Sequence, residues 1–87
     1  GILAFKRMGK KPKNDILVVL NISNNNYTDR ILHIKGKKIW NEVFNSNDIQ
    51  YWGTGEFLNV MPILTNKKSG GNEIKIDVPA LSILIFR

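Results

Sequence analysis

Few side chains in this sequence belong to the types that perform catalysis or bind metals. His33 is the only histidine, and one histidine does not make a two-histidine metal site. None of the serines at Ser23, Ser46, Ser69 and Ser82 lies in a nucleophile-elbow pattern. The chain has no cysteine, which excludes cysteine-based zinc sites, thiol catalysis and disulfides. We therefore interpret His33 as a surface or edge-strand residue.

Carboxylates are the next candidates, because a pair of them can perform glycosidic acid–base chemistry. The seven Asp and Glu residues are scattered, and most lie beside lysine or in turns. Asp48 and Glu56 share one long segment, but nothing sets a separation between them. We expect solvated loop charges and no catalytic residues in this chain.

Gly53-Thr54-Gly55 resembles a fragment of a phosphate-binding loop. The fuller pattern fails, because no third glycine, no Gly-Lys-Ser/Thr and no helix follow it. We favour two glycines at backbone positions that need a positive φ or a close approach.

The neighbouring pair Tyr51 and Trp52 has two interpretations. Exposed aromatic rings stack on sugar rings and bond to hydroxyls through their polar tips. Alternatively, these rings pack under the loop and attach it to the sheet or to a neighbour. Trp40 lies in an expected strand and is predicted to belong to the core.

The elements that position these residues are strands. No window keeps a 3.6-residue apolar period, and short β-branched and aromatic runs alternate with Asn, Gly, Lys and Pro clusters. We predict strands at Leu3–Arg7, Ile16–Ile22, Arg30–Ile34, Ile39–Phe44, Glu73–Val78 and Leu81–Phe86, with a further short one near Val60–Leu64. We expect a hairpin at Lys35-Gly36-Lys37 and a flexible tip at Lys67–Asn72. This pattern favours an antiparallel β-sandwich or barrel.

Two features indicate a neighbour beyond the chain. The segment Asn45–Asn59 resists assignment, and so long a loop in a small domain is usually functional or interfacial. The strand Glu73–Val78 alternates cleanly between apolar and polar residues, whereas Ile16–Leu20 and Leu81–Phe86 are apolar on both faces. Continuous apolar strands indicate that something covers the second face. A strongly curved sheet, or shielding by loops, is the alternative.

The length of 87 residues and the composition indicate a single folded domain over residues 1–87. The apolar fraction is 43% and the charged fraction 23%, which is ordinary for a globular chain. The net charge of +6 attracts polyanions, but the lysines lie mostly in turns and are not interleaved with aromatic residues, which disfavours nucleic acid. No apolar run approaches the length of a membrane span. The absence of cysteine favours the cytosol.

A series of short motifs in order resembles a known family. They are Leu3-Ala4-Phe5-Lys6-Arg7, Leu17-Val18-Val19-Leu20-Asn21, Trp40-x-Glu42-x-x-Asn45-Ser46, Tyr51-x-Gly53-Thr54-Gly55 and Val78-Pro79-Ala80-Leu81-Ser82. Together they resemble the C-terminal all-β domain of the α-amylase superfamily, most closely that of 1,4-α-glucan (glycogen) branching enzymes. The resemblance covers essentially the whole chain. It departs at Asn47 and Trp52, and residues 60–72 match no family motif.

The resemblance implies an antiparallel Greek-key β-sandwich of about seven to eight short strands. It implies that a catalytic (β/α)8 barrel precedes this chain and holds the nucleophile and the acid–base residue, with no metal or organic cofactor. The whole cytoplasmic enzyme would transfer α-1,4-glucan segments to 6-hydroxyls in glycogen synthesis. Whether the parent enzyme branches or hydrolyses glucan stays open. The first residue is not Met, and we expect a longer chain before it.

For this chain the resemblance implies a non-catalytic accessory domain that packs on the barrel. The contact would use one sheet face and the loop residues Asn45, Ser46, Tyr51, Gly53, Thr54, Gly55 and Asn59. One alternative is a carbohydrate-binding module that contacts α-glucan through Tyr51 and Trp52. A basic nucleic-acid-binding β-barrel is the other.

Overall fold

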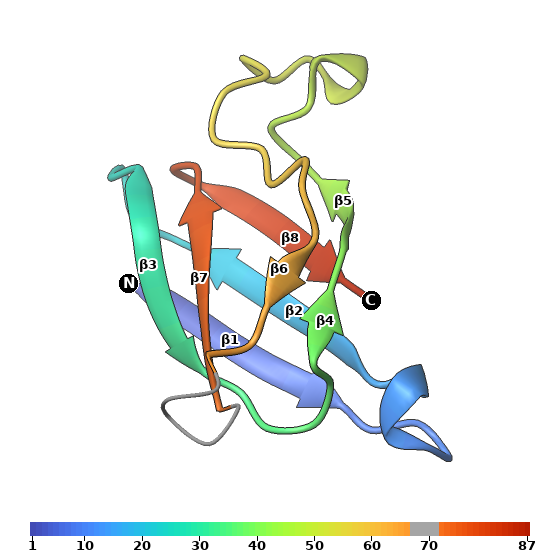
Figure 1. Cartoon of the computed structure of the whole chain (residues 1–87). Helices are drawn as coiled ribbons and strands as arrows, with labels where there is room; N and C mark the ends of the chain where they lie inside the picture. The colour runs from blue at the N-terminus through green and yellow to red at the C-terminus, as the bar shows by residue number, and fades with distance from the viewer. Residues whose placement is uncertain (67–71) are drawn as a thin grey trace.

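The computed structural model describes residues 1–66 and 72–87 as two packed layers of antiparallel strands (Figure 1). The strands are β1 (Ile2–Arg7), β2 (Ile16–Asn21), β3 (Tyr27–His33), β4 (Ile39–Trp40), β5 (Glu42–Asn45), β6 (Ile63–Leu64), β7 (Glu73–Val78) and β8 (Ser82–Phe86). Two 3-10 turns, η1 (Pro12–Asn14) and η2 (Ile49–Tyr51), interrupt the loops. The predicted all-β antiparallel fold is confirmed. Most of the predicted tip at 67–72, including Ser69, lies outside the described residues.

One layer is a four-stranded sheet in the order β1-β2-β8-β5. The other layer consists of two ribbons, β3-β7 and β4-β6, and an antiparallel bridge between Asn66 and Glu73 joins them. The consecutive strands β2 and β3 lie in different layers, as do β7 and β8 (Figure 1). Such connections across the layers are typical of Greek-key sandwiches.

The core lies between the two layers. Alternate residues of the strands point into it, as the two-residue period of a strand requires. Its fully buried members are Leu17, Val19, Trp40, Ile74, Ile76, Val78, Leu84 and Phe86. Trp40 is completely buried, as predicted. Because both layers contribute to one closed core, we expect residues 1–87 to fold as a unit.

Two sequence-based predictions of strand connections are wrong. Lys35-Gly36-Lys37 does not close a hairpin, since β3 pairs with β7 and β4 pairs with β6. The expected strand Ile39–Phe44 is two strands, because the chain changes layers at Asn41. There the Asn41 N–H donates to the Arg87 carbonyl (2.9 Å) and the Arg87 N–H donates to the Asn41 carbonyl (2.8 Å). Propensity alone does not reveal such a corner, since it is set by the partner strand.

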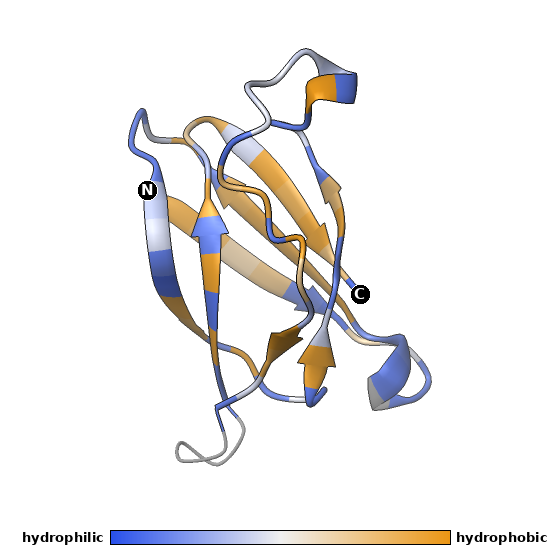
Figure 2. Ribbon diagram, turned by 45° about the horizontal axis from the view of Figure 1, so that its top comes forward, coloured by the Kyte–Doolittle hydropathy of each residue, from blue (hydrophilic) through white to orange (hydrophobic). Residues whose placement is uncertain are grey.

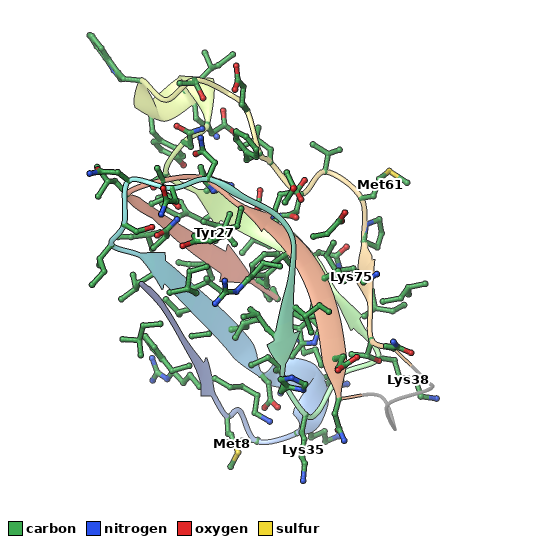
Figure 3. All side chains as sticks on the ribbon, turned by 90° about the vertical axis from the view of Figure 1, so that its left-hand side faces the viewer. Met8, Tyr27, Lys35, Lys38, Met61 and Lys75 are labelled. Atoms are coloured by element: carbon green, nitrogen blue, oxygen red, sulfur yellow. The ribbon has the colours of Figure 1, made fainter. Side chains whose placement is uncertain are left out.

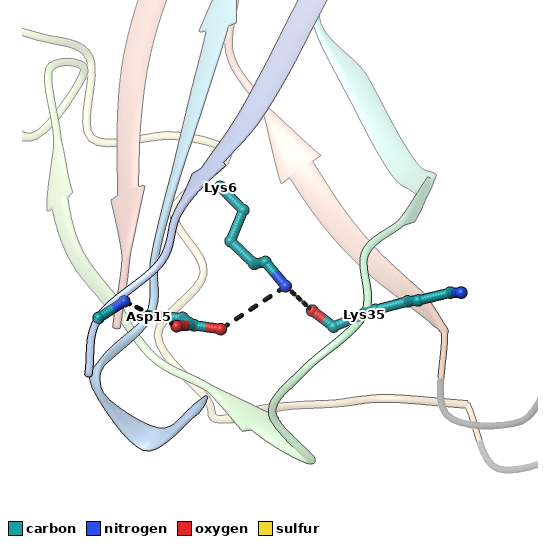
Figure 4. A network of polar contacts seen from close by, with 4 residues as sticks. Lys6, Asp15 and Lys35 are labelled. Atoms are coloured by element: carbon teal, nitrogen blue, oxygen red, sulfur yellow. Dashed lines mark hydrogen bonds and ion pairs between the residues drawn. The ribbon is translucent and has the colours of Figure 1, made fainter. Parts of the chain in front are cut away.

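A lysine crossing from one layer to the other closes the end of the sandwich near η1 (Figure 4). Lys6 Nζ donates to the Lys35 carbonyl (2.8 Å) and lies 3.6 Å from Asp15 Oδ2. Asp15 Oδ1 accepts the Gly9 N–H at 3.0 Å. The Asp15 carboxylate is buried, so these contacts satisfy a charge that would otherwise be costly to bury.

Neighbouring residues of β8 test the position of the core. Leu84→Ala should lower the free energy of unfolding by about 2–5 kcal/mol, because it leaves a cavity between the layers. Ile83→Ala, on the opposite face of the same strand, should change it by less than about 1 kcal/mol. Urea unfolding followed by circular dichroism measures both. Equal losses would contradict the assignment of the two faces.

Candidate interface: an apolar sheet face and the loop of residues 45–59

Glu42 anchors the long loop. Asn59 Nδ2 donates to Glu42 Oε2 (2.6 Å), and the Asn59 N–H donates to Glu42 Oε1 (3.2 Å). Asn59 also bonds to the backbone of Asp77, accepting its N–H at 2.8 Å and donating to its carbonyl at 2.9 Å. Asn45 Nδ2 donates to Glu42 Oε2 at 3.1 Å. One carboxylate therefore holds both ends of the loop, and Asn59 fixes the returning end to β7.

Asn47 shapes the middle of the loop. Its Nδ2 donates to Thr54 Oγ1 (2.8 Å) and to the Glu56 carbonyl (2.9 Å), while its carbonyl accepts the Gly55 N–H at 2.8 Å. A Cβ at Gly53 would lie 2.1 Å from the backbone carbonyl oxygen of Asn47, which is too close for any side chain, and Gly55 has a φ of +76°. The two glycines thus serve a close approach and a positive φ, which confirms the predicted reason for them.

The structure separates the aromatic pair at the loop tip. The Asp48 side chain caps η2 by accepting the Gln50 N–H, and the turn ends at Trp52 in the left-handed region (φ 68°). The Tyr51 ring lies 5.0 Å from the Phe44 ring, centroid to centroid, and tilted. Trp52 is 98% exposed. Tyr51 therefore packs against the sheet, whereas Trp52 stands in solvent.

The second candidate surface is the outer side of the four-stranded sheet, the side away from the core. Residues paired across strands point to the same side, so the register forms two apolar rows, followed by a third row in which Arg7 pairs with Ile16. The members of this outer face are Leu3, Leu20 and Ile83 in one row, and Phe5, Val18, Ile85 and Phe44 in the other. Figure 2 shows hydrophobic colour along the strands of this sheet.

The outer face is open to solvent in this chain. Leu3 is 59% exposed, Phe5 49% and Ile83 44%. At one end of the face, a shallow hollow of about 310 Å³ is lined by Leu20, Ile22, Leu81 and Ile83, among others. Contiguous exposed apolar surface of this kind marks interaction sites on soluble proteins. It agrees with the prediction that β2 and β8 are apolar on both sides.

The loop joins this face at its β5 edge. The Ser46 N–H donates to the Ile83 carbonyl (3.0 Å), and Ser46 Oγ accepts the Ile83 N–H (2.9 Å). Ser46 extends the first row, and Tyr51 on Phe44 extends the second. Of the predicted interface residues, Asn45, Gly53, Thr54, Gly55 and Asn59 instead make bonds or close approaches within the loop or to its anchors. Their predicted contact with a neighbouring domain stays a prediction.

The described part of the chain contains no cluster of metal-binding type. His33 is 75% exposed on β3, and its Nδ1 lies 3.7 Å from Glu73 Oε2, so the predicted surface histidine is confirmed. No group of three or more His, Asp or Glu side chains in residues 1–66 and 72–87 is arranged to hold a metal ion. Within the same residues, no helix is long and apolar enough to cross a membrane.

Two groups of surface residues carry no local signal in the sequence. Leu3 and Phe5 belong to the outer face, but the strand around them is apolar at Ile2 and Ala4 as well, so its faces are not distinguished. The other group is the set of cations around Asn41, which comes from three separate turns and strand ends. Only the pairing of β5 with β8 brings Arg87 to it.

The structure defines an all-β sandwich with one closed core and one open apolar face. The family comparison agrees: the model of the α-amylase C-terminal all-β domain matches residues 1–87. The chain belongs to this family.

The relatives found by sequence similarity are branching enzymes. Over 88 aligned residues, the chain is 26% identical to the 1,4-alpha-glucan branching enzyme GlgB of Oceanobacillus iheyensis, 27% to that of Francisella tularensis subsp. novicida and 28% to that of Francisella philomiragia. Each alignment covers 99% of this chain and 14% of the relative. The chain therefore spans about one seventh of the length of these relatives.

The anchor of the loop is testable by one substitution. Asn59→Ala should lower the free energy of unfolding by about 1–3 kcal/mol, since it leaves the Glu42 carboxylate with fewer donors. The amides of residues 47–56 should exchange with deuterium faster. Gln50→Ala, at an exposed position in the same loop, is the matched control and should leave both quantities unchanged. Unchanged exchange in the Asn59 variant would contradict the anchoring role.

Proposed function

We propose that residues 1–87 form the C-terminal accessory domain of a glycogen branching enzyme. The domain packs on the catalytic domain of the same protein through the outer face of the four-stranded sheet. It contributes no catalytic residue and needs no metal or organic cofactor. Its role is to cover apolar surface on the catalytic domain and to have its own outer face covered in return.

The open apolar face carries this proposal. Seven apolar side chains in two rows form a contiguous surface on one side of the sheet, and interfaces between domains of one chain typically bury about 600–1,500 Å². The relatives are about seven times longer than the alignment, which supports a covalently attached partner of larger size. A partner in the same chain also avoids the entropy of bimolecular association.

The loop of residues 45–59 gives this interface a raised edge. Tyr51 rests on Phe44 and places its ring at the end of the second row. Glu42 and Asn59 hold the loop in place from the core side. The catalytic domain would then contact both the outer face of the sheet and the loop of residues 45–59, which favours a single orientation.

The activity that we propose for the whole protein is the one that its relatives are named for. It belongs to the longer chain and not to residues 1–87 alone. That enzyme transfers segments of 1,4-α-glucan to a 6-hydroxyl in the cytoplasm. Three carboxylates of this chain have structural contacts: Asp15 with Lys6, Glu42 with Asn59, and Asp48 at the cap of η2. This supports a catalytic centre elsewhere in the protein.

Lysine substitutions on the outer face test the proposal. In the longer protein, Ile83→Lys or Phe5→Lys should lower the melting temperature by about 4 °C or more, because a covered lysine loses its solvation. We expect the isolated chain to self-associate through its uncovered outer face, and there the same changes should leave stability nearly unchanged and reduce self-association. Val60→Lys, at an exposed site on the other layer, is the control. Calorimetry and sedimentation measure these quantities.

Loss of stability that is equal in the longer protein and in the isolated chain would contradict the docking proposal. So would an Ile83 variant that behaves like the Val60 control.

A second candidate function rests on Trp52 alone. Its ring is 98% exposed at the end of a capped turn, and an exposed indole suits stacking on a sugar ring. Tyr51 is less suited to a two-ring platform because it packs on Phe44. The ligand would be α-glucan, the polymer named by the relatives.

A titration with maltoheptaose, followed by amide chemical shifts, distinguishes this second function from pure docking. Sugar binding predicts saturable shifts around Trp52 that Trp52→Ala abolishes. Tyr51→Phe keeps the ring on Phe44 and is the matched control, which should retain the shifts. Absence of shifts at millimolar sugar would leave the loop with a structural role only.

A further inference from the structure

Four cationic side chains surround one open hollow beside the Asn41 corner. Lys13 comes from η1, Lys37 and Lys38 precede β4, and Arg87 follows β8. The hollow has a volume of about 750 Å³, within the range of about 300–1,000 Å³ that is typical of small-molecule sites. Its lining includes none of the seven apolar residues of the outer face, but a neighbouring hollow shares Lys13, Val43 and Arg87 with it and reaches Ile85 at the border of that face.

The cations are held by ordered backbone. Lys37 Nζ lies 5.1 Å from the centroid of the Trp40 ring, which is itself in the core. The Lys38 carbonyl accepts the Thr65 N–H at 2.9 Å. The two backbone hydrogen bonds between Arg87 and Asn41 fix the far side. Figure 3 shows the Lys38 side chain extending away from the ribbon, at the same end of the molecule as Lys35. The backbone that carries Lys37, Lys38 and Arg87 is therefore ordered before any ligand arrives.

No carboxylate lines this hollow among the described residues. The two acidic residues nearest to it in sequence are engaged elsewhere: Asp15 with Lys6 and the Gly9 N–H, and Glu42 with Asn59. Like charges within the Debye length of about 8 Å repel one another. A multiply charged anion in the hollow would remove this repulsion and gain several ion pairs at once.

The other residues that line the hollow indicate what the uncharged part of a ligand would contact. Ile39 and Val43 are about half exposed and supply apolar surface, and the Asn41 side chain adds an amide. No aromatic residue lines the hollow among the described residues, and the neighbouring Trp40 is buried, so bases of a single-stranded nucleic acid find no stacking partner there. Lysine and arginine together favour phosphate.

We propose that this hollow binds a small organic phosphate. Its phosphate group lies among Lys37, Lys38, Lys13 and Arg87, and its organic body lies on Ile39 and Val43. This binding site goes beyond the docking role and does not depend on it.

Amide chemical shifts of labelled residues 1–87 test the site in 50 mM salt. The probes are glucose 6-phosphate, inorganic phosphate and glucose. The sugar phosphate should give saturable shifts at Lys37, Lys38 and Asn41 with a dissociation constant near 1 mM, about −4 kcal/mol. Inorganic phosphate should bind at least threefold more weakly, since it lacks a body to cover Ile39 and Val43. Glucose should give no shifts there.

Charge-matched variants distinguish a site from general basicity. The double substitution Lys37→Gln and Lys38→Gln should weaken binding at least tenfold. Lys10→Gln with Lys11→Gln removes the same charge outside the hollow and should leave the affinity within twofold. If the first pair disturbs folding through Trp40, Lys38→Gln with Arg87→Gln takes its place.

Three outcomes would overturn the proposal. One is equal affinity for sugar phosphate and inorganic phosphate. Another is equal weakening by the two lysine pairs. The third is a single-stranded oligonucleotide that binds more tightly than the sugar phosphate and shifts the same amides.

Discussion

The structure depends on a sheet that is apolar on both sides. Leu17, Val19, Leu84 and Phe86 point inward and close the core with the ribbons, while Leu20, Val18, Ile83 and Ile85 point outward from the same two strands. A domain of this size can bury only one face of the sheet in a core, so the other face of the sheet stays exposed to solvent. Exposing this apolar surface to water costs free energy, and a partner that covers the surface would remove that cost. The proposed attachment to a catalytic domain follows from this property of β2 and β8.

The remaining features are arranged around that face. Glu42 points inward at the end of the sheet and binds Asn59 and Asn45, so the long loop rises from the β5 edge in a fixed conformation. Ser46 and Tyr51 then continue the two apolar rows. At the start of β5, the cations around Asn41 form a polar rim that borders the outer face near Ile85. Docking is thus proposed for the outer face, sugar contact for the tip of the loop beside it, and anion binding for the end of the sheet near Asn41.

Much of the fold could be predicted from local patterns, and the exceptions have physical causes. The strands at 16–22, 73–78 and 81–86 were predictable because β-branched runs end at turn residues. The hairpin at Lys35–Lys37 was wrong because pairing partners lie far away in sequence and local turn chemistry does not specify them. The prediction that Gly53 and Gly55 occupy positions that need a close approach or a positive φ is confirmed, because glycine itself signals such backbone positions. The cationic hollow could not be predicted, because tertiary pairing alone gathers Lys13, Lys38 and Arg87.

Hydroxyl-radical footprinting measures the covered surface most directly. The isolated chain and the longer protein are oxidised under identical conditions, and the modification of each side chain is read by mass spectrometry. The docking account predicts that Leu3, Phe5 and Ile83 become protected in the longer protein, while Met61 on the opposite layer, 70% exposed in this chain, stays reactive. Protection at Met61 with unchanged oxidation of Phe5 and Ile83 would contradict it.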